Sequence, residues 1–277
     1  MRDTSSTDLR RYMVYGSRFR SYKCNKFVYP DASKIQRIIV PPEKEKWEVP
    51  WHEYNPPKYN SELLKSKAFA DPDIPNINFK PRWNSKDGKI NRISFLGRYK
   101  IINGYPINPQ KRTGLRGRGV FSRWGPNHAT NLIVTRWKRN NGLKQYHDTT
   151  KKPILQFISI KRRDCEEWAL PGDIIKDGEK VLNALKRKFM EEVLDILDKN
   201  RNNVPYLEIR VNNTFRKGTI VYKGYADDPR NTDNSWLETV AAHFHDKIEK
   251  SGIESLFLSA GDDATNMNLR IPEFIRL

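Results

Sequence analysis

The sequence predicts a mixed α/β (α+β) fold with a smaller, turn-rich N-terminal lobe, and three observations support this. The first half contains both proline pairs, at 41–42 and 56–57, and turns at Asp87-Gly88 and Asn103-Gly104, which disfavour long helices there. Short apolar runs rich in β-branched residues begin near residue 131, which is typical of strands. An amphipathic helix pattern starts at Val181. The chain has 277 residues, enough for one large domain or two modest ones.

The first part of the chain is expected to form a tail and then the lobe. Residues 1–34 show no clean periodicity and are interpreted as a tail, and the lobe is expected over residues 35–128. Turns at Asp87-Gly88 and Asn103-Gly104 would connect short strands. These strands are expected at Ile93–Leu96 and Tyr99–Ile102.

The remainder, residues 129–277, is expected to be a core domain of strands and helices. The expected strands are Asn131–Trp137, Leu155–Ile160 and Thr219–Tyr225, with a turn at Asn140-Asn141-Gly142 after the first. A helix is predicted from apolar residues four apart, at Val181, Leu185, Phe189 and Val193. A second helix is predicted after a cap at Asn234-Ser235, from Leu237, Val240, Ala241, Phe244 and Ile248.

The charge balance leaves three interpretations open. The chain carries 51 Lys and Arg against 33 Asp and Glu, a formal net charge of +18. Nucleic acid, a small ligand such as a nucleotide diphosphate, and a simple solvated basic face all fit this excess. No apolar run approaches the ~18–20 residues that a membrane helix needs. Cys24 and Cys165 are too few for a disulfide framework or a zinc ribbon, which favours a reducing, intracellular setting.

One window contains residues suited to phosphate chemistry. Glu179 is followed eight residues later by Arg187, and then by Glu191 and Glu192. Residues four apart share a helix face, so Arg187 can hold Glu191. Carboxylates are the ligands that Mg²⁺ prefers, and pyrophosphate cleavage needs such a cation. Taken alone, this pattern would usually be an ordinary charged helix face.

With the preceding Trp168-Ala-Leu-Pro-Gly172 turn, the window resembles the Nudix family, whose box is G-x5-E-x7-R-E-U-x-E-E-x-G-U. The resemblance implies a Nudix fold, metal ligation by Glu179, Glu191 and Glu192, and catalytic roles for Arg187, Glu191 and Glu192. The implied cofactor is Mg²⁺, with Mn²⁺ as the alternative metal.

Three box positions depart from the family pattern. Asp173 replaces the opening Gly, and Leu194-Asp195 replaces the closing Gly and aliphatic residue. Lys188 stands where the family has a Glu that is often a metal ligand or base. This substitution changes the local charge by two units and puts catalytic activity in doubt more than ligand binding.

Three further segments resemble the human-type ADP-ribose pyrophosphatases, and with them the C-terminal domain of the melastatin-type TRP cation channels. They are Arg112–His128, Tyr222–Trp236 and Ala260–Ala264. The resemblance implies substrate binding by Asp228, Arg230, Asn127 and Arg116, and a catalytic carboxylate at Asp263. Each segment also has an ordinary structural interpretation. The first could be a basic loop, the second a self-bonded Asx turn and the third a polar loop.

Two other features are expected to be structural. His243 and His245 would not face each other on a helix, which argues against a metal site. The tryptophans Trp124, Trp137, Trp168 and Trp236 are expected to pack in the core, although one of them could stack on adenine.

The leading hypothesis is an enzyme, an ADP-ribose pyrophosphatase that hydrolyses ADP-ribose to AMP and ribose 5-phosphate with Mg²⁺. The alternative is a hydrolysis-impaired ADP-ribose sensor domain of a melastatin-type channel, whose partner would be the rest of a tetrameric channel. The expected location is intracellular: the cytosolic face of a membrane for the sensor, otherwise cytoplasm or mitochondrion. Specific nucleic-acid binding is the weakest hypothesis, because no RNP, KH, zinc-finger or helix-turn-helix pattern accompanies the charge.

Overall fold

The computed structural model describes residues 28–30, 34–162, 168–193, 215, 218–246 and 264–270. Their contacts divide the chain into two units. The first unit comprises the described residues of Met1–Ala129 together with Lys223–Thr239, and the second those of Thr130–Tyr222 and Val240–Leu277. The sequence placed a boundary at residue 128 and assigned 223–239 to the core domain. That domain division stays a prediction.

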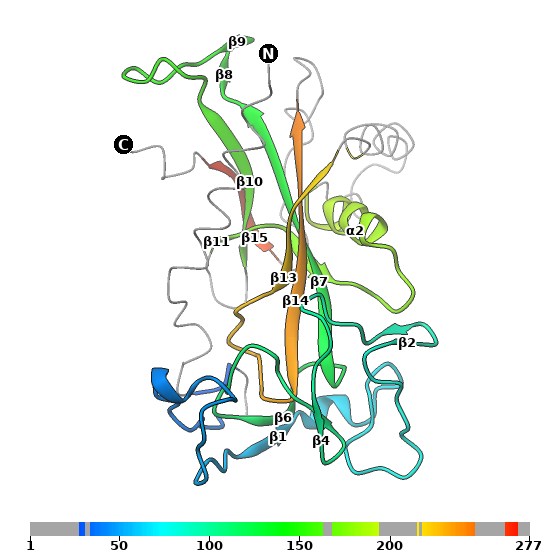
Figure 1. The fold of residues 1–277 in the computed structure, drawn as a ribbon. Coiled ribbons are helices and arrows are strands. Elements are labelled where there is room, and N and C mark those ends of the chain that lie inside the picture. The colour runs from blue at the N-terminus through cyan, green and yellow to red at the C-terminus, as the bar shows by residue number, and fades with distance from the viewer. Residues whose placement is uncertain are drawn as a thin grey trace. The chain divides into compact units, whose positions relative to one another are not determined.

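The first unit is built largely from turns and very short strands (Figure 1). Its elements before residue 120 are η2 (Pro42–Lys44), β1 (Lys58–Asn60), η3 (Glu62–Leu64), β2 (Lys86–Asp87), β3 (Ile90–Asn91), β4 (Ile101–Ile102), β5 (Tyr105–Pro106) and β6 (Arg116–Gly119). β1 pairs in parallel with β6, whereas β2–β3 and β4–β5 are antiparallel hairpins. Proline-rich segments with many turns favour such short elements over helices.

The predicted turns of the lobe are confirmed, but one predicted strand is wrong. Asn103 and Gly104 both have positive φ, 50° and 82°, as a two-residue hairpin turn requires. Ile93–Leu96 forms no strand. In this segment Ser94 Oγ and the Phe95 backbone N–H donate to the Glu238 carboxylate, so its polar groups are satisfied by a side chain rather than by a neighbouring strand.

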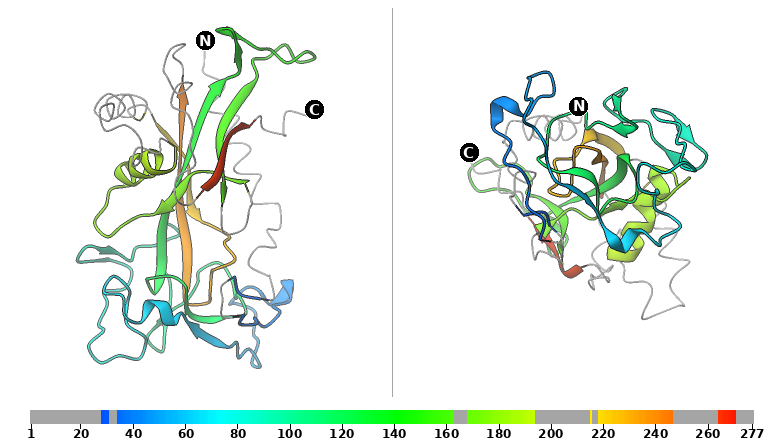
Figure 2. Two further views of the ribbon diagram at one scale, coloured as in Figure 1. Left: turned by 180° about the vertical axis from the view of Figure 1, so that it is seen from behind. Right: turned by 90° about the horizontal axis from the view of Figure 1, so that it is seen from below.

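The longer strands form one sheet with the order β11-β10-β7-β14-β13, in which β12 also pairs with β7 and β15 with β10. The strands are β7 (Gly125–Trp137), β10 (Leu155–Arg162), β11 (Trp168–Ala169), β12 (Gly172–Ile174), β13 (Thr219–Tyr225), β14 (Ser235–Asp246) and β15 (Ala264–Arg270). The predicted strands beginning at residues 131, 155 and 219 are therefore confirmed. Figure 2 shows β15 alongside β10, with which it pairs antiparallel.

The predicted second helix is wrong, because residues 235–246 form strand β14. Every residue from Ser235 to Phe244 is buried, so apolar side chains occur on both faces of the strand. In such a strand the apolar positions include the i, i+3, i+4 spacing by coincidence, and periodicity alone cannot separate strand from helix.

The predicted first helix is confirmed as α2 (Val181–Val193), and it carries the box residues from position 181 onward. Its buried side chains include Ala184, Leu185 and Phe189. The Phe189 ring lies 5.2 Å from that of Phe215, which lies 4.3 Å from that of Phe244, so these three rings form an aromatic core in the second unit.

A hairpin, β8 (Arg139–Asn140) and β9 (Leu143–Lys144), extends from the end of β7 before the chain returns as β10 (Figure 1). It confirms the predicted turn, since Asn141 and Gly142 have φ of 48° and 80°. Among the residues that the structure describes, no helix has the length and apolarity to cross a membrane.

Candidate functional site

The centre of the box segment is Arg187 on α2, which binds two carboxylates of the second unit. Its Nε donates to Glu179 Oε1 at 3.0 Å and its Nη2 to Glu179 Oε2 at 3.1 Å. Its Nη1 donates to Asp173 Oδ2 at 2.9 Å. The planar guanidinium therefore fixes the loop before α2 through a bidentate pair. Asp173, which departs from the family glycine, supplies the second acceptor.

Glu179 is held as a carboxylate. Hydrogen bonding to Arg187 lowers its pKa, and the Lys176 backbone N–H, which donates to Oε2 at 3.0 Å, acts in the same direction. A carboxylate offers about four lone-pair positions, and three are used by these donors. Among the described residues no donor uses the remaining lone pair of Glu179, so this carboxylate fits a hard divalent cation as a ligand through a single oxygen.

The other predicted metal and catalytic carboxylates are less fully described. Glu191 and Glu192 lie on α2 one turn after Arg187, but their side chains lie outside the part that the structure describes. Asp263 lies outside the described residues altogether. Among the described residues, no group of three His, Cys, Asp or Glu side chains forms a candidate metal cluster.

Lys188, which replaces a family glutamate, is buried on α2, with 5% of its surface exposed. It is therefore not part of a solvated lysine face, which a charged helix would ordinarily present. Its side chain is therefore enclosed within the second unit, next in sequence to Arg187.

The predicted substrate residues Asp228 and Arg230 form a pair in the first unit. Arg230 Nε and Nη2 both donate to the Asp228 carboxylate at 2.8 Å, and the Arg230 backbone N–H donates to it at 2.9 Å. The Arg230 guanidinium also lies over the Phe121 ring, 5.5 Å from its centroid. Both residues are half-buried, so the pair presents a fixed guanidinium and carboxylate rather than two independent charges.

The predicted substrate residues Asn127 and Arg116 have different surroundings. Asn127 is buried, and its amide donates to the Arg123 and Gly125 carbonyls and to Ser235 Oγ. That side chain therefore holds the start of β7 in place. Arg116 is exposed on β6, and its backbone N–H donates to the Pro57 carbonyl. Within the described ranges its guanidinium has no hydrogen-bond acceptor.

A buried carboxylate that the sequence analysis missed is Glu238 on β14. It accepts hydrogen bonds from Ser94 Oγ, the Phe95 N–H and Trp236 Nε1. His128 Nε2 lies 3.8 Å from it and 3.0 Å from the Ile93 carbonyl oxygen. Burial lowers the pKa of His128, against the opposing effect of Glu238. The sequence did contain one indication of this buried charge, because Glu238 is a single glutamate within the apolar run of β14.

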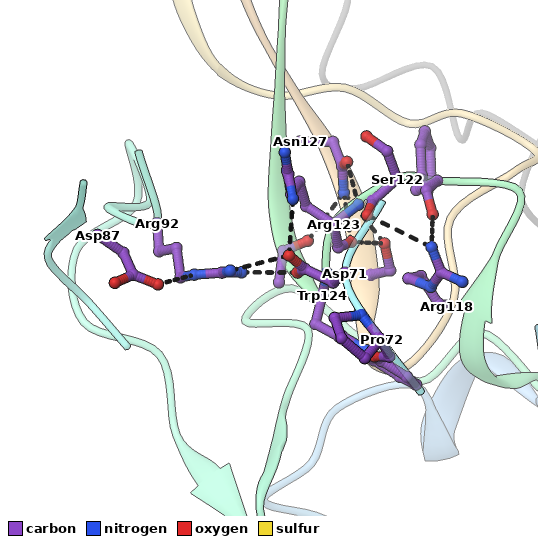
Figure 3. Close-up of polar contacts among 12 residues, drawn as sticks. Asp71, Pro72, Asp87, Arg92, Arg118, Ser122, Arg123, Trp124 and Asn127 are labelled. Atoms are coloured by element: carbon purple, nitrogen blue, oxygen red, sulfur yellow. Dashed lines mark hydrogen bonds and ion pairs between the residues drawn. The ribbon is translucent and has the colours of Figure 1, made fainter. Parts of the chain in front are cut away.

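A second missed cluster surrounds Asp71 (Figure 3). Arg92 donates to Asp71 through Nη1 at 2.7 Å and Nη2 at 2.9 Å, and Arg123 Nη1 donates to it at 2.8 Å. The Trp124 backbone N–H completes the shell at 2.9 Å. The Asp71 and Arg92 side chains are each 2% exposed, so this is a buried ion pair with its polar atoms satisfied.

Asp233 is a third buried carboxylate of the first unit. It accepts from Tyr54 Oη at 2.6 Å and from the backbone N–H and hydroxyl of Thr113. Burial raises the pKa of Asp233 to about 6, although these hydrogen bonds act in the opposite direction. The cluster anchors the glycine-rich segment after Arg112 to the chain around residue 233.

His243 and His245 do lie on one face, contrary to the expectation from a helix, because residues two apart on strand β14 point to the same side. Their ring nitrogens lie 2.7 and 2.9 Å from the Thr135 hydroxyl on β7. The expectation that Trp124 and Trp236 pack in the core is confirmed, since both are fully buried.

Comparisons with known proteins place this geometry in context. Residues 40–125 match the family described as NUDT9-like, N-terminal domain. The mitochondrial ADP-ribose pyrophosphatase of Rattus norvegicus is 48% identical over 239 residues, covering 85% of this chain and 68% of the rat protein. The putative nudix hydrolase 6 of Caenorhabditis elegans is 40% identical over 235 residues, covering 84% and 82%.

Ion channels share the same region. The transient receptor potential cation channel subfamily M member-like 2 of Nematostella vectensis is 39% identical over 249 residues, covering 88% of this chain. The match covers only 16% of the channel, so most of the channel has no counterpart here.

Proposed function

Since the chain belongs to the NUDT9-like family of Nudix hydrolases, we propose that it hydrolyses ADP-ribose to AMP and ribose 5-phosphate with Mg²⁺. We call the hydrogen bonds from Arg187 to Glu179 and Asp173 the Arg187 clamp. The observation that carries the proposal is this clamp in a chain that is 48% identical to an ADP-ribose pyrophosphatase. The clamp fixes an ionised Glu179 at the start of the box helix, which is the preorganisation that a metal-assisted hydrolase needs.

Each box residue has a distinct task in this proposal. Glu191 and Glu192 on α2, with one oxygen of Glu179, would hold the divalent cation. Arg187 keeps the Glu179 carboxylate charged and correctly oriented. When bound, Mg²⁺ neutralises charge on the diphosphate and lowers the pKa of a water. Asp263 is assigned as the carboxylate that accepts the proton of the attacking water.

The reaction is a hydrolysis whose atoms balance. Water attacks one phosphorus of the diphosphate, and the bond from that phosphorus to the bridging oxygen breaks. The hydroxyl stays on the attacked phosphorus, and the bridging oxygen leaves with the other phosphate. We assign the first-unit residues Asp228, Arg230, Asn127 and Arg116 to substrate recognition, where a guanidinium suits phosphate oxygens and a carboxylate suits ribose hydroxyls.

The test is AMP production from ADP-ribose with Mg²⁺, for the wild type and for Glu192→Gln. The variant should lower turnover by about a hundredfold or more, because loss of a metal ligand removes several kcal/mol of charge stabilisation. The matched control Glu62→Gln removes an exposed glutamate in the first unit and should leave turnover unchanged. Wild-type turnover that Glu192→Gln does not reduce would defeat the site assignment.

A sensor is the second candidate, favoured by the buried Lys188 and by the similarity to a TRPM channel. This candidate predicts that calorimetry detects ADP-ribose binding while the wild type produces no AMP. Restored hydrolysis in Lys188→Glu would attribute the loss to that one residue. Because the site is buried, each variant needs a thermal melt to show that it is folded. Rapid Mg²⁺-dependent turnover by the wild type excludes a pure sensor.

A further inference from the structure

The segment between β7 and β10 has a concentrated positive charge. From Arg136 to Lys152 the sequence holds six Lys or Arg residues and one Asp, a net charge of +5 with His neutral. Within the part of the chain that the structure describes, no carboxylate pairs with four of its lysines: Lys138, Lys144, Lys151 and Lys152. The proposed hydrolysis does not use this charge.

The segment 138–154, the basic hairpin, is folded rather than a loose loop. The Lys138 N–H donates to the Ile154 carbonyl at 2.8 Å, and the Gln145 N–H donates to the Lys138 carbonyl at 2.9 Å. The Ile154 N–H donates in turn to Gln145 at 2.9 Å, and the His147 N–H to the Lys152 carbonyl at 2.9 Å. The backbone that carries its cations is therefore ordered before any partner binds, so binding does not have to fold this segment.

Two cations of the basic hairpin lie directly across from each other. Arg139 and Lys144 are cross-strand partners in β8–β9. Like charges in this position destabilise a strand pair in isolation. The arrangement becomes favourable when an anionic surface neutralises both groups.

The basic hairpin also exposes apolar side chains beside these cations. Leu143 is 73% exposed and Tyr146 is 54% exposed, on either side of Lys144. A leucine gains nothing from phosphate oxygens or from a polar peptide, but it gains free energy by entering a hydrocarbon layer. A tyrosine places its ring in the same layer while its hydroxyl stays among polar headgroups.

We propose that the basic hairpin docks this protein on an anionic phospholipid surface, with Lys138, Lys144, Lys151 and Lys152 over the headgroups and Leu143 and Tyr146 inserted between them. Cations combined with an exposed leucine and a tyrosine are the composition of interfacial membrane-binding segments. Nucleic acid would use the lysines but would leave Leu143 without a function. In this proposal the hairpin lies on the membrane surface and does not cross the bilayer.

The test is sedimentation of the whole protein with extruded vesicles of phosphatidylcholine, with or without about one third phosphatidylserine. Wild type should sediment only with the anionic vesicles. Lys144→Glu changes two charge units and should weaken binding by roughly thirtyfold. Leu143→Ser should weaken it by about tenfold, and this loss should persist at about 0.5 M salt, where the lysine contribution is screened.

Matched controls carry the same changes outside the hairpin. Ile77→Ser removes an apolar side chain that is at least as exposed as Leu143, and Lys89→Glu reverses the charge of an exposed lysine, both in the first unit. Both controls should bind vesicles like the wild type, and Lys151→Glu should repeat the effect of Lys144→Glu. Melting temperatures within about 2 °C would establish that the variants are folded.

Two results would overturn the proposal. One is equal sedimentation with neutral and anionic vesicles, or none with either. The other is a hairpin variant that binds anionic vesicles like the wild type while losing affinity for RNA or DNA, which would assign the hairpin to nucleic acid instead. AMP production with soluble ADP-ribose is independent of both results, so failure here leaves the proposed hydrolysis untouched.

Discussion

The Asp71 cluster and the Arg187 clamp are both ion pairs between arginine and carboxylate side chains, but they differ in how deeply they are buried. Asp71 and Arg92 are 2% exposed and Asp71 accepts hydrogen bonds from two arginines and a backbone N–H. Arg187 is 20% exposed, and the part of the chain that the structure describes supplies Glu179 with three donors for about four lone pairs. A buried pair must be complete to be tolerated, so it serves stability. A partly exposed pair can retain room for a ligand, which is what the proposed metal-binding role of Glu179 needs.

Asp71→Ala should cause the largest loss of stability. Of the described carboxylates, Asp87 alone would then remain paired with the buried Arg92, through its Nε, and Arg123 would lose its bond to Asp71. Removing one partner of a buried pair costs about 3–5 kcal/mol. Urea unfolding should therefore show a markedly lower midpoint with an unchanged m-value.

The control for Asp71→Ala is Glu62→Ala, which removes an exposed ion pair with Lys65 three residues away. Exposed pairs of this kind are worth about 0.5 kcal/mol or less. If the two variants lost similar stability, burial would not explain the difference between the clusters.

Gly114→Ala should come next, because Gly114 lies against a neighbouring backbone. Its φ is +75°, and a Cβ there would collide with the Ile38 carbonyl oxygen. Left-handed strain and a backbone clash together predict a loss of about 2–4 kcal/mol. In the matched Gly88→Ala, φ is +61° and the space around the new Cβ is empty, so strain alone should cost about 1 kcal/mol. Equal melting temperatures for the two variants would contradict the close approach.

Arg187→Lys should affect activity more than stability. An ammonium cannot reproduce the planar fork that binds Glu179 through Nε and Nη2 while Nη1 binds Asp173. We expect turnover of ADP-ribose to fall by about a hundredfold, which corresponds to about 2.7 kcal/mol of transition-state stabilisation. The matched variant Lys180→Arg, an exposed site just before α2, should keep wild-type turnover. A fall in melting temperature as large as that of Asp71→Ala would instead make the clamp structural.

The sequence predicted elements well where one local signal decides the structure. The turns at Asn103-Gly104 and Asn141-Gly142 need positive φ, and these residue types supply it. The α2 helix has one buried face, so its apolar residues keep helical spacing. The box spacing likewise identified Glu179 and Arg187, which the structure brings together. Their catalytic and metal-binding roles remain predictions.

Prediction from the sequence failed where contacts between distant segments determine the structure. Strand β14 is buried on both faces, so its pattern carried no period of two and resembled a helix. Asp71 and Arg92 lie 21 residues apart and Ser94 and Glu238 lie 144 apart, and no local pattern relates such partners. The acceptor role of Asp173 was also missed, because the family comparison treated it only as a lost glycine.

The smallest effect, and the one that separates the two units most cleanly, is expected from pH. Burial lowers the pKa of His128 below its ordinary 6.5, so the folded state favours the neutral ring. Its contribution to stability is present above pH 6.5 and is lost as the pH falls below it, with a slope of at most about 1.4 kcal/mol per pH unit. Arg187 lowers the pKa of Glu179, so that contribution is present above the ordinary pKa of 4.5 and is lost only in stronger acid.

The free energy of unfolding, measured with urea, should therefore fall more for the wild type than for His128→Gln when the pH is lowered from about 7.5 to about 5.5. Asp233, whose pKa is raised to about 6, changes stability in the opposite direction, but it does so in both proteins and cancels in their difference. Glu179→Gln should remain parallel to the wild type over this range and diverge only in stronger acid. If the His128→Gln profile were also parallel to the wild type, His128 would not be held neutral by burial beside Glu238, and the pH dependence of the first unit would not arise from this histidine.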